Sequence, residues 1–169
     1  MVSSLLAEGV QEVGEKATQM GYTGFAVAMI GVAICVILCG IGSAIGLYKT
    51  GTAAAGVLGE APKKFGKVLL LVLLPATQGL YGFVIGLIAS GSIGVEMTLS
   101  QGWALLGAVM PMAVSGLITG IFQGKSSANC IHAAGKQDSL GIKLVIYPAM
   151  IEFYAILGLV ISIMLLPLV

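Results

Sequence analysis

The sequence predicts an all-α membrane protein whose four transmembrane helices form two tandemly duplicated hairpins and assemble into an oligomeric ring. Its composition, four long apolar segments and an internal repeat support this prediction. Of its 169 residues, 58% are hydrophobic and 9% are charged, against roughly 25% charged residues in soluble domains. The net charge is +1 and all eight basic residues are lysines, a balance that argues against a nucleic-acid partner. The chain is therefore expected to lie in lipid.

The first half begins with residues 1–20, which we interpret as an amphipathic N-terminal lead-in at or outside the membrane surface. The first hairpin is then expected over residues 21–91. Its first span, 21–48, carries no charge and continues as a small-residue helix to a polar loop at 60–67. Its second span covers residues 68–91. Both spans reach the length of about 20 residues that crosses a bilayer.

The second hairpin is expected over residues 101–169. Its first span, 103–123, has a more polar helical extension to Lys136, and a loop containing Asp138 and Ser139 follows. The last span begins near Leu140 and is apolar to the C-terminus, apart from two charged residues.

The two hairpins repeat each other. Pro75 and Pro148 are 73 residues apart, as are Tyr81 and Tyr154, so LLPATQGLYGFVIGLI aligns with IYPAMIEFYAILGLVI. A repeat of this kind indicates a duplicated structural unit. Glu152 aligns with Gly79, so only the second half carries a carboxylate at this position.

The first and third spans carry glycines at small-xxx-small spacing: Gly42 and Gly46 on one, and Gly116, Gly120 and Gly124 on the other. Such spacing lets helix backbones approach closely in lipid. It fits packing within one chain, or crowding of these helices around the common axis of a ring, with the bulkier second and fourth spans facing lipid.

Lysines are distributed unequally between the two sides of the membrane. Seven lie on the side of the two loops that close the hairpins, and the opposite side carries four glutamates with Lys16 alone. Because lysine and arginine are enriched in cytoplasmic loops, we expect cytoplasmic hairpin loops and both termini outside the cell membrane. The seven lysines are Lys49, Lys63, Lys64, Lys67, Lys125, Lys136 and Lys143.

Glu152 is the most informative residue. It lies nine residues after Lys143, about 13 Å along a helix, near the middle of a bilayer core about 30 Å thick. A carboxylate there costs roughly 2.5–3.5 kcal/mol and usually marks an ion or proton path. The alternative is a neutral glutamate hydrogen-bonded to a neighbouring helix.

Polar side chains in the other spans match this depth. Gln78 lies 11 residues after Lys67, about 16 Å along a helix, and Thr77 and Tyr81 share one face because they are four residues apart. Gln123 ends the third span. Hard cations need several oxygen ligands, whereas a proton needs only a carboxylate, so this set favours Na⁺ over H⁺. Simple interhelical hydrogen bonding remains the alternative for Thr77 and Gln78.

These hairpins, with LPATQGLYGF in the first and YPAMIEFYAILG in the second, resemble the four-helix proteolipid of V-type ATPases, called K in bacterial Na⁺-pumping enzymes. The resemblance implies a rotor ring of identical copies, turned by ATP hydrolysis in a separate head through a central-stalk subunit. Each copy would then pass a membrane stator subunit that bears an essential arginine. The long lead-in and Lys49 depart from the expected pattern.

The resemblance also implies an ion site, with Tyr81 closing over the ion. The coupling ion would be Na⁺, with H⁺ as the alternative. The implied Na⁺ ligands are the Leu74 backbone carbonyl, Thr77, Gln78, Gln123 and Glu152.

No catalytic residues are expected in this chain. The stretch GIFQGKSS suggests a phosphate loop, but Thr119 stands where GxxxxGK[ST] requires glycine, so no bound nucleotide is expected. The sequence therefore predicts a non-catalytic transport subunit, and a purely structural membrane oligomer is the more distant alternative.

Overall fold

A computed structural model describes residues 2–137, 139–140 and 142–169, without the side chains of residues 2–7, 13, 16–21 and 142. Asp138, predicted to lie in the second hairpin loop, is outside the described residues. The described residues are helical apart from short connections. The α-helices are α1 (Val2–Glu60), α2 (Phe65–Leu73), α3 (Thr77–Ser90), α4 (Leu99–Lys136) and α5 (Ile146–Leu165), and the 3₁₀ helices are η1 (Pro62–Lys64), η2 (Leu74–Ala76), η3 (Ile142–Val145) and η4 (Leu166–Leu168).

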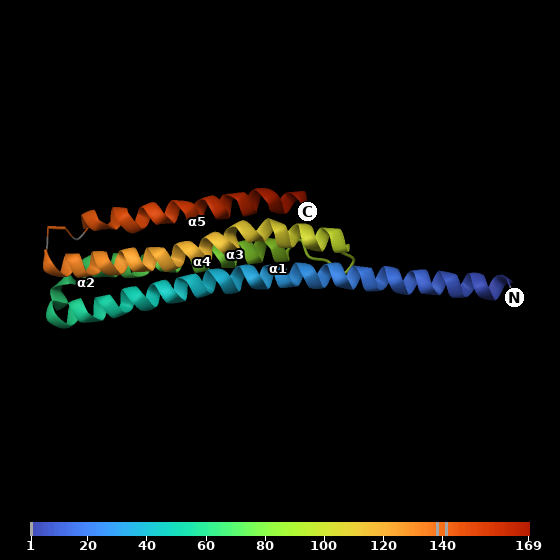
Figure 1. The fold of residues 1–169 in the computed structure, drawn as a ribbon, viewed down its shortest axis with the longest axis horizontal. Coiled ribbons are helices and arrows are strands. Elements are labelled where there is room, and N and C mark those ends of the chain that lie inside the picture. The colour runs from blue at the N-terminus through green and yellow to red at the C-terminus, as the bar shows by residue number, and fades with distance from the viewer. Residues whose placement is uncertain (1, 138, 141) are drawn as a thin grey trace.

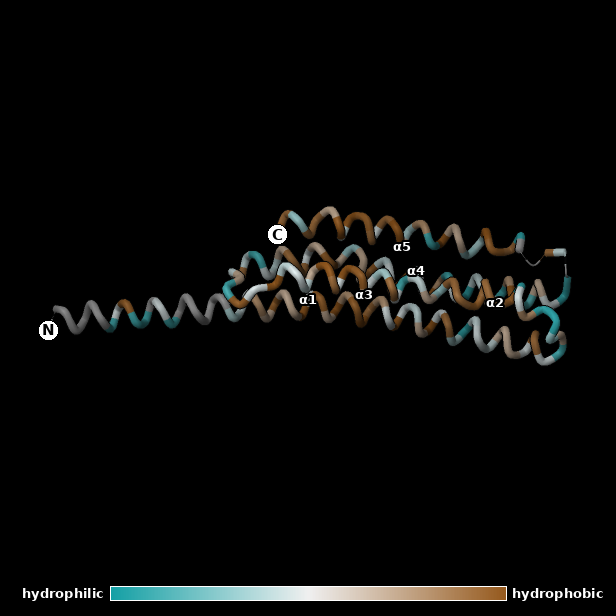
Figure 2. Tube along the Cα trace, turned by 180° about the vertical axis from the view of Figure 1, so that it is seen from behind, coloured by the Kyte–Doolittle hydropathy of each residue, from teal (hydrophilic) through white to brown (hydrophobic). Residues whose placement is uncertain are grey.

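Four helical segments are long and apolar enough to cross a membrane: Tyr22–Glu60, Pro62–Ser90, Leu99–Lys136 and Lys143–Leu168. The four predicted spans are therefore confirmed. Figure 1 shows them side by side as a bundle, with the N-terminal part of α1 projecting beyond the other helices. Hydrophobic residues dominate the middle of the bundle, and hydrophilic residues gather where the hairpin loops lie (Figure 2). The bundle thus has the polarity of a membrane-embedded protein.

The glycines of the first and third spans bring α1 and α4 together. A Cβ atom added to Gly42 would lie 2.6 Å from the carbonyl oxygen of Gly116, and one added to Gly46 would lie 2.5 Å from that of Gly120. A Cβ on Gly124 would meet the Cα of Gly46. Because these backbones touch, the two repeated glycine motifs form a single interface within one chain.

Helices α2 and α3 are separated by the short 3₁₀ turn η2, which contains Pro75. Proline lacks the N–H that would continue the helical ladder, and the helix changes from α to 3₁₀ at this position. Thr50 of α1 supports this turn, because its Oγ1 lies 3.1 Å from the carbonyl oxygen of Val72. Gly79 likewise donates its backbone N–H to Ser43 Oγ at 2.7 Å. The helices on both sides of the turn are therefore hydrogen-bonded to side chains of α1.

Side-chain hydrogen bonds also cap both ends of α4. At the loop end, Lys64 Nζ donates to the carbonyl oxygens of Gly135 at 2.6 Å and Ala134 at 3.3 Å, so η1 caps the last turn of α4. At the opposite end, Thr98 begins α4 with a capping box: its Oγ1 accepts from the Gln101 N–H, and Gln101 Oε1 accepts from the Thr98 N–H. Of these contacts, those of Lys64 join α4 to the first hairpin loop.

Candidate ion-binding site

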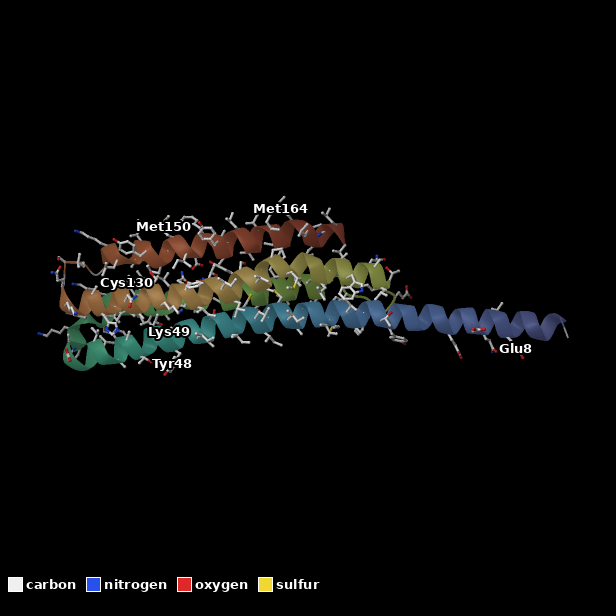
Figure 3. The ribbon with its side chains drawn as sticks, viewed as in Figure 1. Glu8, Tyr48, Lys49, Cys130, Met150 and Met164 are labelled. Carbon is white, nitrogen blue, oxygen red and sulfur yellow. The ribbon has the colours of Figure 1, made fainter. Side chains whose placement is uncertain are left out.

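The carboxylate of Glu152 lies where α5 faces the start of α3, and it is half-buried within the single chain. Pro148, one turn before it, is buried, and α5 packs on α4 along its length. In this arrangement Glu152 faces polar groups on two other helices, α3 and α4. Figure 3 labels Met150 on the same helix, two residues before Glu152.

Both carboxylate oxygens of Glu152 accept hydrogen bonds. Tyr81 donates its hydroxyl to Oε1 at 2.7 Å. Gln123 donates its Nε2 to Oε2 at 2.6 Å, and Gln78 donates its Nε2 to the same oxygen at 3.2 Å. Thr77 Oγ1 lies 3.0 Å from Oε2. Four polar side chains from α3 and α4 thus surround the carboxylate.

The two glutamine side chains are fully buried and linked to each other. Gln78 Nε2 donates to Gln123 Oε1 at 2.7 Å, and Gln123 Nε2 also donates to the carbonyl oxygen of Pro148 at 3.1 Å. Gln78 Oε1 is buried without a hydrogen-bond partner. A buried acceptor without a donor is costly, and a cation would satisfy it. The oxygen and nitrogen of an amide also exchange places when the amide turns by half a rotation, so either glutamine can present oxygen towards Glu152.

Thr77 connects the carboxylate to the backbone of η2. Its Oγ1 lies 2.9 Å from the carbonyl oxygen of Leu74 and 3.0 Å from Glu152 Oε2. A threonine hydroxyl has one proton, so it donates to only one of these oxygens at a time. When Glu152 is ionised, two of these oxygens therefore face each other without a proton between them, and a small hard cation suits such a pair.

The structure therefore brings together all six residues predicted from the sequence: Leu74, Thr77, Gln78, Tyr81, Gln123 and Glu152. Sequence reasoning missed three supporting groups, namely the Pro148 carbonyl, Thr50 and Ser43. The prolines gave a partial signal, because carbonyls near proline often need partners outside the helix. Nothing in the sequence pointed to α1 as the source of Thr50 and Ser43.

The arrangement defines a class of protein: a membrane proteolipid with duplicated hairpins and a carboxylate among neutral oxygens. A family model that describes the C subunit of ATP synthase matches residues 30–89 and again residues 106–165, which confirms the duplication. The chain belongs to this family of ATP synthase C subunits.

Three relatives indicate which C subunits within this family the chain resembles. The chain is 47% identical over 148 residues to the K subunit of the V-type sodium ATPase of Enterococcus hirae, covering 88% of this chain and 94% of that one. It is 36% identical to the K subunit of the A-type ATP synthase of Methanocaldococcus jannaschii, over 81% of this chain and 60% of the relative. It is 22% identical to the 16 kDa proteolipid of the human V-type proton ATPase, over 82% and 89%. The resemblance to V-type ATPase proteolipids is thus confirmed, and the chain is a non-catalytic, multi-pass membrane subunit.

The Tyr81 hydroxyl yields a first prediction about this site. Replacing Tyr81 with phenylalanine removes the 2.7 Å hydrogen bond to Glu152 Oε1 and leaves the ring in place. A hydrogen bond to a charged group contributes about 1.5–3 kcal/mol. Na⁺, the ion that the sequence predicts for this site, is therefore expected to bind about tenfold more weakly, a change of about 1.4 kcal/mol. Equilibrium binding of ²²Na⁺ to the purified protein measures this change. Tyr154→Phe is the matched control, because Tyr154 is the repeat counterpart of Tyr81 and is 67% exposed; an equal loss in both variants would contradict the assignment.

Proposed function

We propose that this chain is the rotor-ring subunit of a V-type ATPase and carries Na⁺ across the membrane on Glu152. The observation that carries the proposal is the contact of the Glu152 carboxylate with Thr77, Gln78 and Gln123, all within 3.2 Å. The buried, unpartnered Gln78 Oε1 supports a cation rather than a proton. So does the name of the Enterococcus hirae relative, which is that of a sodium ATPase.

In this proposal, the ligands of Na⁺ are Glu152, Thr77, Gln78, Gln123 and the Leu74 carbonyl. Tyr81 orients the carboxylate of Glu152 by donating a hydrogen bond to Oε1, the oxygen that the other side chains do not contact. An ionised carboxylate facing lipid costs roughly 2.5–3.5 kcal/mol, so the site leaves the stator only when it is loaded. A fixed positive charge on the stator, which we infer to be an arginine, lowers the cost of the free carboxylate and permits exchange. Rotation and transport thereby depend on each other.

The partners in this proposal are copies of the same chain in a ring, the membrane stator, a central stalk that transmits ATP hydrolysis, and lipid. Within each copy, residues 21–91 and 101–169 act as the two hairpin units, and residues 1–20 form the lead-in. The family-model matches lie inside these two units, which supports the division. The lysines of the hairpin loops support a cytoplasmic position for these loops, with both termini outside the cell membrane.

Protection of Glu152 from a hydrophobic carbodiimide tests the coupling ion. Carbodiimide reacts with a protonated carboxyl group, so bound Na⁺ is expected to slow the labelling of Glu152 strongly at fixed pH. Mass spectrometry of the labelled protein at increasing Na⁺ concentration, with K⁺ as the ionic-strength control, measures the effect. If millimolar Na⁺ gave no protection, the same rotor would carry H⁺, as the names of several relatives state for those proteins.

A further inference from the structure

Two buried hydroxyl groups of α1 face the break between α2 and α3. Ser43 and Thr50 are 7% and 0% exposed, and they share one face of α1 because the seven residues between their positions make about two helical turns. Gly46 lies between them on this face, where an added Cβ atom would lie 2.6 Å from Pro75 Cβ. This face of α1 therefore packs against the proline turn η2. We call Ser43 and Thr50 the hydroxyl pair.

The hydroxyl pair bonds one backbone group on each side of the break. The Val72 carbonyl lies in the last turn of α2, and Gly79 is the third residue of α3, so both groups belong to the helix ends, where backbone groups lack an internal partner. Thr50 Oγ1 lies 3.1 Å from the Val72 carbonyl oxygen, and also 3.1 Å from that of Leu47 in its own helix. Ser43 Oγ accepts the Gly79 N–H at 2.7 Å. The hydroxyl pair thus supplies a donor on one side of the interrupted helix and an acceptor on the other.

The second hairpin lacks both hydroxyl groups. At the repeat distance of 74 residues, Leu117 and Gly124 stand in place of the hydroxyl pair. The α-helix α5 also continues through Pro148, where the first hairpin has its 3₁₀ turn. The interrupted helix and the hydroxyl groups that bond it thus occur together, in the hairpin that supplies Thr77 and Gln78 to the ion site.

We propose that the hydroxyl pair makes the site selective for Na⁺ over H⁺, an inference that rests on the proposed function. Three of the proposed Na⁺ ligands, Leu74, Thr77 and Gln78, lie in or directly after the η2 turn. Glu152 comes from α5 and is also bonded by Gln123 of α4, at 2.6 Å. Because Na⁺ needs several oxygen ligands and a proton needs only the carboxylate, movement of the turn weakens Na⁺ binding and leaves protonation in place. The members of the hydroxyl pair are therefore positioning residues, which act through the ligands near the turn.

Thr50→Val tests this role, because valine keeps the shape of threonine and removes the hydroxyl group. Na⁺ is expected to bind about tenfold more weakly, the effect of one lost buried hydrogen bond. The pH dependence of carbodiimide labelling of Glu152 in Na⁺-free buffer is expected to stay unchanged. Mass spectrometry of the purified full chain gives both quantities, the first as the Na⁺ concentration for half-maximal protection at fixed pH. Ser43→Ala removes the acceptor on the other side of the turn, is expected to give the same result, and carries the test if Thr50→Val does not fold.

Further variants separate hydrogen bonding from packing. Thr50→Ser keeps the hydroxyl group without the methyl group and is expected to retain the Na⁺ binding of the wild type. Thr52→Val is the matched control for Thr50→Val, because Thr52 is exposed and bonds a carbonyl oxygen of its own helix at 2.8 Å. Ser90→Ala is the control for Ser43→Ala, because Ser90 Oγ also bonds a carbonyl oxygen of its own helix, at 2.7 Å. Both controls are expected to bind Na⁺ as the wild type does.

The hydroxyl pair would lose this role under any of three results. Wild-type Na⁺ protection in Thr50→Val and Ser43→Ala would show that the two hydroxyl groups are not needed. An equal loss in Thr50→Ser and Thr50→Val would assign the effect to packing. A change in the pH dependence of Na⁺-free labelling as large as the change in Na⁺ binding would show general damage to the site. If Na⁺ gave no protection even in the wild type, Na⁺ would not be the coupling ion, and the proposed function would fail together with this role; the two failures are thus distinguishable.

Discussion

Replacing Glu152 with glutamine is expected to abolish saturable Na⁺ binding and ATP-driven Na⁺ transport. The substitution keeps the size of the side chain and most of its contacts with Tyr81, Gln78 and Gln123. It removes the negative charge of the site, because the other oxygens, those of Thr77 and the two amides, are neutral. The Na⁺ affinity is therefore expected to fall by at least about 100-fold, equivalent to about 2.7 kcal/mol.

Titration of purified protein with ²²Na⁺ measures this loss, and Na⁺ uptake into vesicles containing the whole ATPase measures transport. The wild type is expected to bind one ion per chain. Glu96→Gln is the matched control, because Glu96 is exposed in the connection between α3 and α4 and lies outside the site. Saturable Na⁺ binding or continued Na⁺ transport by Glu152→Gln would refute both the site and the carrier role.

The residues of this site could be predicted because depth in a membrane is readable from sequence. Charged loop residues fix the ends of each span, and the helical rise of about 1.5 Å per residue places Gln78 and Glu152 at one level. The structure joins them at 3.2 Å. The hydrogen bonds of the two glutamine amides could not be predicted in the same way. Which amide group faces which oxygen, and that Gln123 also reaches the Pro148 carbonyl, depend on how each helix is rotated about its axis.

The packing of α1 could also be predicted only in part. Glycine spacing predicted close helix approach, but it left open whether the partner lay in the same chain. The structure pairs Gly42 with Gly116 and Gly46 with Gly120, which are 74 residues apart in both cases. Side chains of α1 then contact the helices that flank the η2 turn: Thr50 Oγ1 lies 3.1 Å from the carbonyl oxygen of Val72 at the end of α2. No local pattern could indicate this support, because it depends on a contact between helices.

Substitution at Gly46 is expected to damage both the fold and the ion site. An alanine Cβ there would lie 2.5 Å from the Gly120 carbonyl oxygen and 2.6 Å from Pro75 Cβ, so α1 must move away from α4 and η2. Overpacking of this kind costs about 1–3 kcal/mol, and the better helix propensity of alanine offsets only about 0.8–1 kcal/mol of that. Because Pro75 belongs to the turn that carries the Leu74 carbonyl, the Na⁺ affinity should fall together with the stability.

Reversible unfolding in mixed detergent micelles measures the stability of Gly46→Ala, and ²²Na⁺ binding measures the site in the same samples. Gly59→Ala is the matched control, because Gly59 lies in α1 with nothing within 4 Å of the added Cβ, and it is expected to be neutral or slightly stabilising. Gly46→Leu should prevent the α1–α4 contact altogether and yield little folded protein. If Gly46→Ala matched Gly59→Ala in both stability and Na⁺ binding, the close α1–α4 contact would not be needed to position η2. That result would contradict the inference that α1 supports the ion site.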